Sequence, residues 1–261
     1  MVLTLSIGGI PLRFEIRSKD MALRIAARYS GFLLKRAAPA ITFNCTFTGR
    51  QLANNEDVSV SREDVGTWCI YRSDFICTFQ ESIGTIEVHR SIFAFDACLR
   101  ALYATILNRR NGFLLHSAGV LRKNNAFCFA GVSGSGKTTI AHLAPGYGQV
   151  LNDEIIACRI VQPQTIMVYG TPFWGAMRDG PAYNKGYPLK ALCFLIKDTA
   201  TTMVPLAGED ALIKLLRCCC IFSDSVEDST ALMRTGAALV NTLPVYDLHF
   251  KKSPALWNGI Q

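Results

Sequence analysis

The stretch AFCFAGVSGSGKTTIAHLAPGYGQVLNDE, residues 126–154, decides the fold of this chain. Its first five residues are apolar and predict a short buried strand. The segment 138–144 predicts a helix that ends before Pro145 and Gly146. The loop between them, GVSGSGKT, matches the pattern G-x-x-x-x-G-K-[ST]. A strand, a glycine loop and a helix in this order predict a phosphate-binding loop.

The residue types of this loop suit phosphate binding. Glycines can adopt backbone angles that other residues rarely reach, so successive N–H groups can point at an anion. The amino-terminal end of the following helix adds positive potential. We expect the Lys137 ammonium to reach the β- and γ-phosphates of ATP, and the Thr138 hydroxyl to bind Mg²⁺. The expected nucleotide-binding residues, with the two serines as loop filler, are Gly131, Ser133, Gly134, Ser135, Gly136, Lys137, Thr138 and Thr139.

A predicted strand with two adjacent acids follows at short distance. It spans residues 148–156, and Asp153 lies sixteen residues after Lys137. Because only a short helix separates the two segments, the acids can return beside the same phosphates. Adjacent residues on a strand point to opposite faces, so Asp153 and Glu154 can serve one site only if the strand ends or bends there. The alternative is a solvated acidic strand end.

Three elements in this order resemble the HPr kinase/phosphorylase superfamily, including the HPr-kinase-like enzymes that phosphorylate lasso-peptide precursors. They are His116 in LLHSAGV, the loop GVSGSGKT and the acidic segment LNDEIIA. The family has a His in the first element, GxSGxGKS/T in the second and paired acids, often Asp-Asp, in the third. Here the pair is Asp153-Glu154, and the second acid departs from that pattern. The other register, Asn152-Asp153, would leave the first acidic position without a base, and the following apolar run favours Asp153-Glu154.

The resemblance covers roughly residues 95–261. It implies an α/β fold with a P-loop kinase core of the HPr kinase/phosphoenolpyruvate carboxykinase-like type. It also implies transfer of the γ-phosphate of ATP to a hydroxyl, that of a Ser in a peptide or protein. Since the HPr kinases form closed rings, a homo-oligomer is expected as well. The second family motif, which accompanies phosphorylase activity, is not found here, and this favours a kinase only.

In this reading the site residues divide into roles. Asp153 accepts or orients the proton of the acceptor hydroxyl, while His116 lines the site and Lys137 contacts the phosphates. Thr138, Glu154 and Asp153 are the expected ligands of Mg²⁺.

A Gly- and Pro-rich loop follows the expected catalytic strands. Residues 170–180, GTPFWGAMRDG, carry aromatic side chains and one arginine, and the loop is long enough to be functional. We expect Arg178 to neutralise the charge of the transferred group. The alternative is an ordinary solvated arginine on a surface loop.

The chain divides into two expected parts. Residues 1–95 predict a mostly β module, and residues 96–261 predict the kinase domain, which begins with a helix that ends near Asn108. The module is expected to position an acceptor or partner, and the alternative is a part that only stabilises the fold. Its predicted elements are a helix over 19–32 and strands over 2–7, 12–16, 41–48, 66–71, 75–80 and 85–90.

Composition narrows the functional classes. Half of the 261 residues are apolar and 18% are charged, so the chain can build a sizeable core. No apolar run approaches the length of a membrane span, and the amino-terminal stretch lacks the basic start of a signal peptide. The net charge of +7 is not gathered in a basic stripe with interleaved aromatics. We therefore expect no nucleic acid and no membrane among the partners.

The ten cysteines favour a reducing compartment. None forms C-x-x-C, no Cys/His set has zinc spacing, and most lie in apolar runs, where Cys acts as a small hydrophobe. The run 218–220 is three cysteines on a predicted helix over 211–221, where they would point in three directions and make a poor metal site. The expected location is the cytoplasm.

Two other functions stay open. The first is a small-molecule kinase or a carboxykinase-like enzyme, which a requirement for a small alcohol or an oxaloacetate-like acid would reveal. The second is a nucleotide-responsive peptide-binding protein without catalysis, which ATP-dependent binding without a phosphorylated product would reveal.

Overall fold

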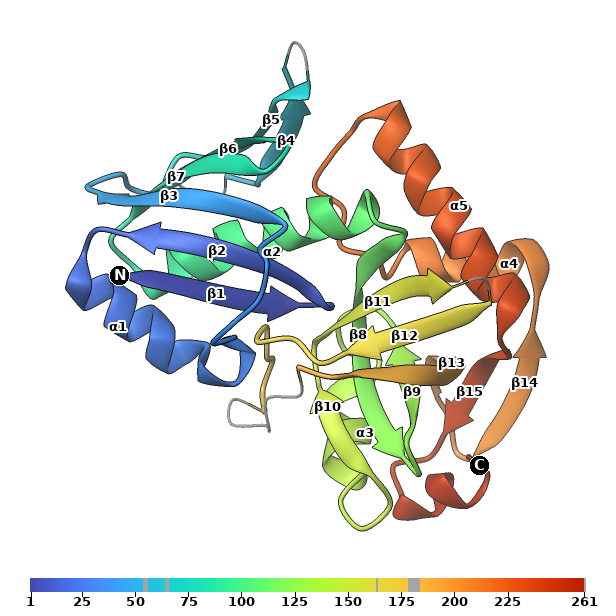
Figure 1. Ribbon diagram of the computed structural model, residues 1–261. Helices are drawn as coiled ribbons and strands as arrows, with labels where there is room; N and C mark the ends of the chain where they lie inside the picture. Colours follow the sequence, from blue (N-terminus) through green and yellow to red (C-terminus); the bar gives the residue numbers. More distant parts are fainter. Residues whose placement is uncertain (54–55, 64–65, 163, 178–183, 261) are drawn as a thin grey trace.

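The computed structural model describes residues 1–53, 56–63, 66–162, 164–177 and 184–260. Two sheets stand side by side, and the long helix α2 (Ile92–Asn108) links them (Figure 1). The architecture is mixed α/β, which confirms the coarse fold class predicted from the sequence. No helix among the described residues is long and apolar enough to cross a membrane.

The first sheet has seven strands in the order β1-β2-β3-β7-β6-β5-β4. β3 pairs in parallel with both β2 and β7, and the other neighbours pair antiparallel. The edge strand β4 was not predicted, because its sequence SVSR contains a single apolar residue. The strands are β1 (Val2–Ile7), β2 (Ile10–Ile16), β3 (Ile41–Thr48), β4 (Ser59–Arg62), β5 (Trp68–Arg72), β6 (Phe75–Gln80) and β7 (Ile83–His89).

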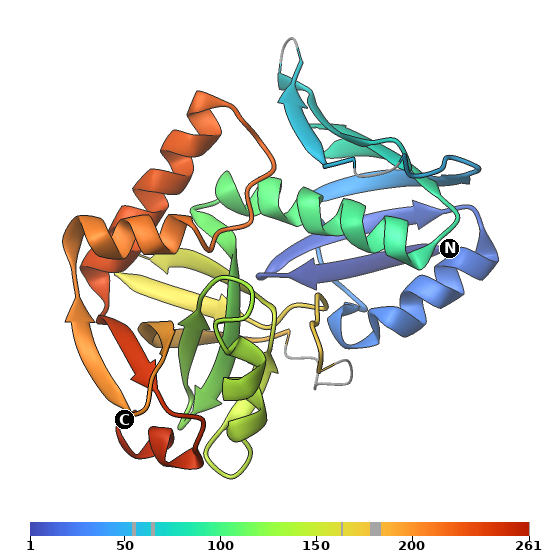
Figure 2. The same ribbon diagram turned by 180° about the vertical axis from the view of Figure 1, so that it is seen from behind.

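Helices α1 (Lys19–Arg28) and α2 pack on this sheet (Figure 2). The ring of Phe95 on α2 packs against Phe14 on β2 and against Tyr29 at the end of α1, with centroids 5.8 and 6.0 Å apart. The predicted helix over 19–32 is wrong at its end. α1 stops at Arg28 and a short 3₁₀ helix, η1 (Ser30–Phe32), follows, because Ser and Gly at 30–31 favour a turn.

The second sheet has eight strands in the order β10-β8-β11-β12-β13-β15-β14, and β9 pairs with both β8 and β13. β9, β13 and β15 run parallel, so their carboxyl ends lie at one edge of the sheet. The strands are β8 (Gly112–Arg122), β9 (Asn125–Ala130), β10 (Gln149–Asn152), β11 (Ile155–Gln162), β12 (Thr165–Tyr169), β13 (Gly186–Lys197), β14 (Thr202–Leu206) and β15 (Val245–Phe250).

Helices cover both faces of this second sheet. α4 (Gly208–Leu216) and α5 (Val226–Thr242) cover one face, and α3 (Lys137–Leu143) covers the other with the carboxyl-terminal 3₁₀ helix η3 (Pro254–Asn258) (Figure 1). Strand β8 is buried on both sides because its side chains divide between these two layers.

The predicted helix over 211–221 is wrong at its end. α4 ends at Leu216, and the following residues run beside β8. There Cys219 forms an isolated antiparallel β-bridge with Leu115. Cys220 N donates to Leu114 O at 2.9 Å, and His116 N donates to Cys218 O at 2.7 Å. Pairing with a central strand therefore overrides the local helical pattern.

One of the buried apolar clusters spans both sheets. Residues of β1, β2 and α2 cluster with residues of β8, β11 and β12. Gly8 at the β1–β2 turn approaches Leu107 and Ala157, and its carbonyl accepts a 2.9 Å hydrogen bond from the Arg159 guanidinium. The predicted division at residue 95 falls inside α2, which packs on both parts.

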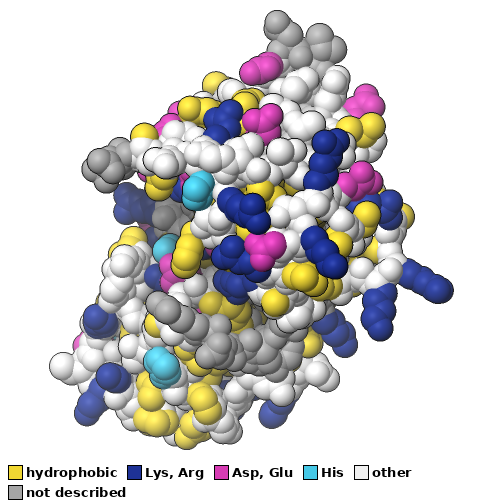
Figure 3. Space-filling view, turned by 90° about the vertical axis from the view of Figure 1, so that its left-hand side faces the viewer, with side chains coloured by type: hydrophobic (Ala, Val, Ile, Leu, Met, Phe, Trp, Pro, Cys, Tyr) yellow, Lys and Arg dark blue, Asp and Glu magenta, His cyan; other side chains and the backbone are white. Residues whose placement is uncertain are grey.

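Surface charge is mixed on the face shown in Figure 3. Lys and Arg side chains lie there among Asp and Glu side chains and do not gather into a stripe.

Candidate active site

The glycine loop 131–136 joins β9 to α3 in the order that the sequence predicts. β9 ends at Ala130 and α3 begins at Lys137. Gly136 caps the helix with φ +112, and a Cβ at this position would lie 2.6 Å from the ring of Phe250. Only glycine meets both demands, because other residues rarely adopt this angle and have no room there.

Lys137 is held inside its own loop. Its Nζ donates to Gly131 O at 2.9 Å and to Val132 O at 3.2 Å, and the residue is buried. Burial lowers the pKa of the Lys137 ammonium, and the nearby Glu154 and Cys218 oppose that shift. To contact a phosphate, the ammonium would exchange these two carbonyls for phosphate oxygens.

A cavity of about 270 Å³ opens in front of this loop. It brings the loop together with residues from three other places in the chain. Gly131 and Ser135 instead lie against each other at the base of the loop. The cavity is lined by His116, Ser133, Gly134, Gly136, Lys137, Thr138, Thr139, Glu154 and Lys197.

His116 and Glu154 form a close pair in this cavity. His116 Nε2 lies 2.5 Å from Glu154 Oε1. Pairing of β8 with β11 sets this contact, because His116 stands opposite Ile155 and Ser117 N donates to Glu154 O at 3.0 Å. Both side chains are about one-third exposed, which leaves them accessible from the cavity.

Gly175, in the loop after β12, packs against Asp153 and Glu154. A Cβ at this position would lie 2.9 Å from Glu154 Oε2 and 3.2 Å from Asp153 Oδ2. Only a residue without a side chain allows the loop after β12 to approach both acids this closely.

Asp153 has a different environment from its neighbour. It is fully buried, and its carboxylate accepts three backbone hydrogen bonds, from Gly175 N at 3.0 Å, Ala176 N at 3.0 Å and Met177 N at 3.1 Å. Both oxygens are therefore engaged in holding the loop after β12. Asp153, the residue predicted to take the acceptor proton and to share in binding Mg²⁺, has a side chain that does not line the cavity.

Asn152 explains why the two acids separate. β10 ends at this residue and β11 begins at Ile155, so the chain bends at the acids and the strand predicted over 148–156 is divided in two. Asn152 Oδ1 accepts from Glu154 N at 2.7 Å and from Ile155 N at 2.9 Å. Its Nδ2 donates to Thr171 O at 2.9 Å. Asn152 is thus a buried turn residue, which favours the Asp153-Glu154 register.

The sequence did not indicate that Lys197 and Cys218 lie near the loop. Lys197 reaches the cavity from the end of β13, and the signal for it was the parallel pairing of β13 with β9, which only tertiary structure reveals. Cys218 lies against the loop, because Gly131 N–H contacts its sulfur. Burial raises the pKa of the Cys218 thiol, while Lys137 and Gly131 N–H oppose that shift. Arg178, the predicted charge-neutralising residue, lies outside the described residues.

The arrangement can bind an anion at the loop and move a proton beside it. Two cations, Lys137 and Lys197, share one cavity with the hydroxyl of Thr138 and the His116–Glu154 pair. No group of three His, Cys, Asp or Glu side chains in the described ranges is placed to hold a metal ion by itself.

Comparison with known proteins places the chain in a family. No curated protein matches it. The family described as SynChlorMet cassette protein ScmC matches residues 75–261, which include both the glycine loop and the His116–Glu154 pair. Since this match spans more than half of the chain, the protein belongs to the ScmC family.

Proposed function

We propose that the protein is an ATP-dependent kinase that transfers the γ-phosphate to a hydroxyl, that of a Ser in a peptide or protein. The observation that carries the proposal is one cavity in which Lys137 and Thr138 of the glycine loop stand with the His116–Glu154 pair. Phosphoryl transfer depends mainly on positioning and charge neutralisation, and this cavity supplies groups for both. The core would then be a P-loop kinase of the HPr kinase/phosphoenolpyruvate carboxykinase-like type.

The residues of the cavity fit a nucleotide with Mg²⁺. The ammonium groups of Lys137 and Lys197 would face the phosphates. Thr138 Oγ1 and Glu154 Oε2 are hard oxygen ligands of the kind that Mg²⁺ prefers, and the ion needs only one or two protein carboxylates when phosphates and water complete its shell. When bound, Mg²⁺ would neutralise charge on the transferred group.

We assign the proton transfer to His116 and Glu154 in place of Asp153. When His116 Nε2–H donates to Glu154 Oε1, the lone pair of Nδ1 is free to accept the proton of the acceptor hydroxyl. The Glu154 carboxylate orients the imidazole and stabilises the imidazolium that forms. The hydroxyl oxygen then forms its bond to the γ-phosphorus as the bond to ADP breaks, while Lys137 and Lys197 offset the charge on the phosphoryl oxygens.

Mass spectrometry of acceptors incubated with the protein, ATP and Mg²⁺ tests this proposal. The family description as a cassette protein directs the choice of acceptors to Ser-containing peptides encoded by neighbouring genes, with small hydroxy compounds in parallel. We expect the mass of one phosphate on a peptide Ser, its absence with Lys137→Ala, and its retention with Lys19→Ala, which removes an exposed lysine on α1.

Other outcomes would replace the proposal. Phosphate on a small compound alone would indicate a metabolite kinase. ATP-dependent peptide binding with no phosphorylated product would indicate a binding protein.

A further inference from the structure

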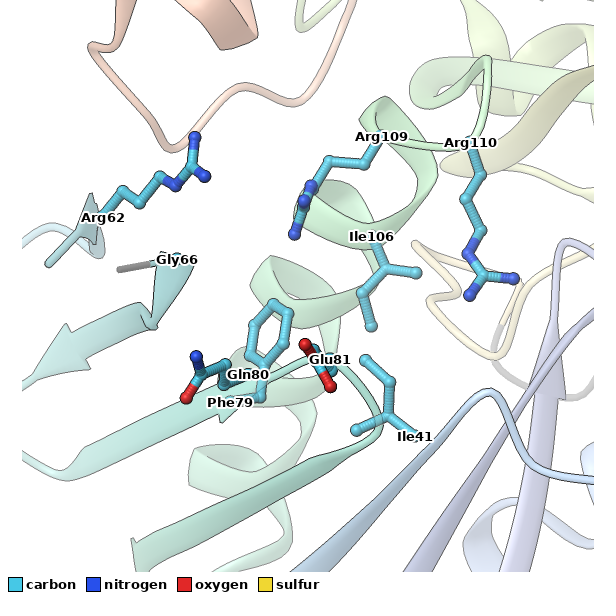
Figure 4. Close-up of a pocket in the computed structure, with 9 residues that line it drawn as sticks. All are labelled: Ile41, Arg62, Gly66, Phe79, Gln80, Glu81, Ile106, Arg109 and Arg110. Atoms are coloured by element: carbon cyan, nitrogen blue, oxygen red, sulfur yellow. The ribbon is translucent and has the colours of Figure 1, made fainter. Parts of the chain in front are cut away.

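A second cavity lies on the amino-terminal module and shares no lining residue with the first. Its volume is about 380 Å³, and it lies between strands β4–β6 and the carboxyl-terminal end of α2. Figure 4 shows the residues that line it, which are Ile41, Arg62, Gly66, Phe79, Gln80, Glu81, Ile106, Arg109 and Arg110.

Three arginines line this cavity, and two of them face each other. The guanidinium groups of Arg62 and Arg109 point toward the space between them, and Arg110 stands on the other side of Ile106 (Figure 4). Within the described part of the chain, none of the three forms a salt bridge. Burial lowers the pKa of Arg109, and the neighbouring charge of Arg62 lowers it further, against a smaller opposing effect of Asp228. The cavity thus concentrates positive charge that an anion would offset.

An aromatic ring holds two of these charges near each other. The guanidinium carbons of Arg62 and Arg109 lie 5.9 and 4.7 Å from the ring centre of Trp68. Trp68 is only 4% exposed, so its ring is a fixed cation–π surface for both groups.

We propose that this cavity binds an acidic side chain of an extended peptide, with the carboxylate placed between Arg62 and Arg109. The apolar side chains of Ile41, Phe79 and Ile106 line the same space and would cover the methylene groups next to such a carboxylate.

Two features favour a peptide over a nucleic acid. Glu81 stands in the same wall, and its carboxylate can accept a peptide N–H, a donor that a phosphate backbone lacks. The neighbouring strand β4 is at the edge of its sheet, and among the described residues its outer side makes one isolated bridge, from Val60 to Ser223. An edge strand of this kind can pair with an extended peptide.

The segment 218–223 connects this cavity to the candidate active site. Its first residue, Cys218, accepts a hydrogen bond from His116 N, and its last, Ser223, bridges Val60 of β4. An extended acceptor held by its acid in the second cavity would therefore lie beside a segment that leads to the His116–Glu154 pair. This role as an acceptor-docking site rests on the proposed kinase function, whereas the binding itself does not.

Fluorescence anisotropy with the full-length protein and no ATP tests the binding. The probe is a fluorescein-labelled Ser-containing peptide with four glutamates, and its control has four glutamines in their place. We expect the glutamate peptide to bind, and the glutamine peptide to bind about tenfold more weakly or worse, because charge-assisted hydrogen bonds are lost. Arg62→Gln and Arg109→Gln should each weaken binding of the glutamate peptide by a similar factor. Arg24→Gln, at an exposed position on α1, should leave this binding unchanged.

Further readouts separate this proposal from the kinase function. Binding of the glutamate peptide should persist in Lys137→Ala. If the peptide is phosphorylated, Arg109→Gln should raise its KM and leave kcat unchanged. Binding without phosphorylation would support the cavity and remove only its role in catalysis.

Several results would overturn the proposal. Equal binding of the two peptides would contradict it. So would undiminished binding of the glutamate peptide by Arg62→Gln and Arg109→Gln, provided that melting curves show both variants folded. Tighter binding of a single-stranded oligonucleotide at the same site would contradict it as well. Binding of citrate as strongly as the peptide would indicate a small-acid site and would equally contradict a peptide site.

Discussion

Asp153 and Glu154 are neighbours in sequence with opposite surroundings. Three backbone N–H groups of the loop after β12 hold the buried Asp153 carboxylate, whereas Glu154 faces the cavity and contacts His116. A carboxylate whose oxygens are already bonded is poorly placed to take up a proton or a metal ion. The pair thus divides into one residue that holds a loop and one that is available for chemistry.

The two acids should respond differently to loss of charge. We expect Glu154→Gln to lower turnover by about two to four orders of magnitude, the usual contribution of proton transfer by a positioned side chain. Asp153→Asn should instead lower the free energy of unfolding by about 1–3 kcal/mol, because buried N–H groups lose a charged acceptor.

Initial phosphorylation rates and urea unfolding of both variants check this pair of predictions. Asp153→Asn with wild-type stability and lost turnover would restore Asp153 as the proton acceptor.

At the scale of elements, helix α2 fastens the β1–β2 hairpin to the rest of the fold. The hydroxyl of Tyr103, on the buried face of α2, lies 3.0 Å from Leu5 O and 3.1 Å from Ile10 O. It can donate to either carbonyl, and burial raises the pKa of this phenol well above its usual value. One side chain on the helix therefore closes both strands of the hairpin near their turn.

Removal of this hydroxyl should loosen the hairpin. We expect Tyr103→Phe to lower the free energy of unfolding by about 1–3 kcal/mol, because two buried carbonyls lose the one donor that they share. The matched change Tyr71→Phe, at a position 39% exposed on β5, should stay within about 0.5 kcal/mol of wild type. Urea unfolding measures both, and equal stability of the two variants would show that the Tyr103 hydroxyl contributes nothing.

Across the whole molecule, burial holds most cysteines in the protonated form. It raises the pKa of the Cys193 thiol to about 12 and is the main reason that the pKa of Cys220 is raised to about 11. The pKa values of Cys45 and Cys77 are raised as well, mainly by burial. In the unfolded chain a thiol ionises near pH ~8.5. A thiol with a raised pKa in the folded state contributes stability below that pH and loses it as the pH rises.

The free energy of unfolding should therefore fall as the pH rises from about 8 to 10, by about 1.4 kcal/mol per pH unit for each protected thiol once the pH exceeds ~8.5. The sign follows because the unfolded chain releases protons that the folded chain retains. Urea unfolding in reducing buffer at several pH values measures the slope. Cys193→Ala should reduce the slope by one proton whatever its effect on stability at pH 7, and an unchanged slope would contradict the prediction.

The local elements of the candidate site follow from the sequence, and their relation to one another does not. The apolar run before Gly131 and the helical pattern after Gly136 predicted β9 and α3, because period and glycine placement are local signals. Lys197 could not be found this way, since its approach to the loop depends on the parallel pairing of β9 with β13 across sixty residues of chain. The end of α4 was missed for the same reason.

The sequence by itself determined the strand, the glycine loop and the helix around residues 131–138 and the α/β class, because glycine backbone freedom and hydrophobic period act over a few residues. Tertiary structure alone decided that Glu154 meets His116 while Asp153 is buried. That choice depends on the hydrogen bond that Glu154 N donates to Asn152 Oδ1 and on those that Asp153 accepts from backbone N–H groups at 175–177, some twenty residues further along the chain. The direction of a side chain at a bend depends on whichever distant groups satisfy it, and no local pattern encodes those groups.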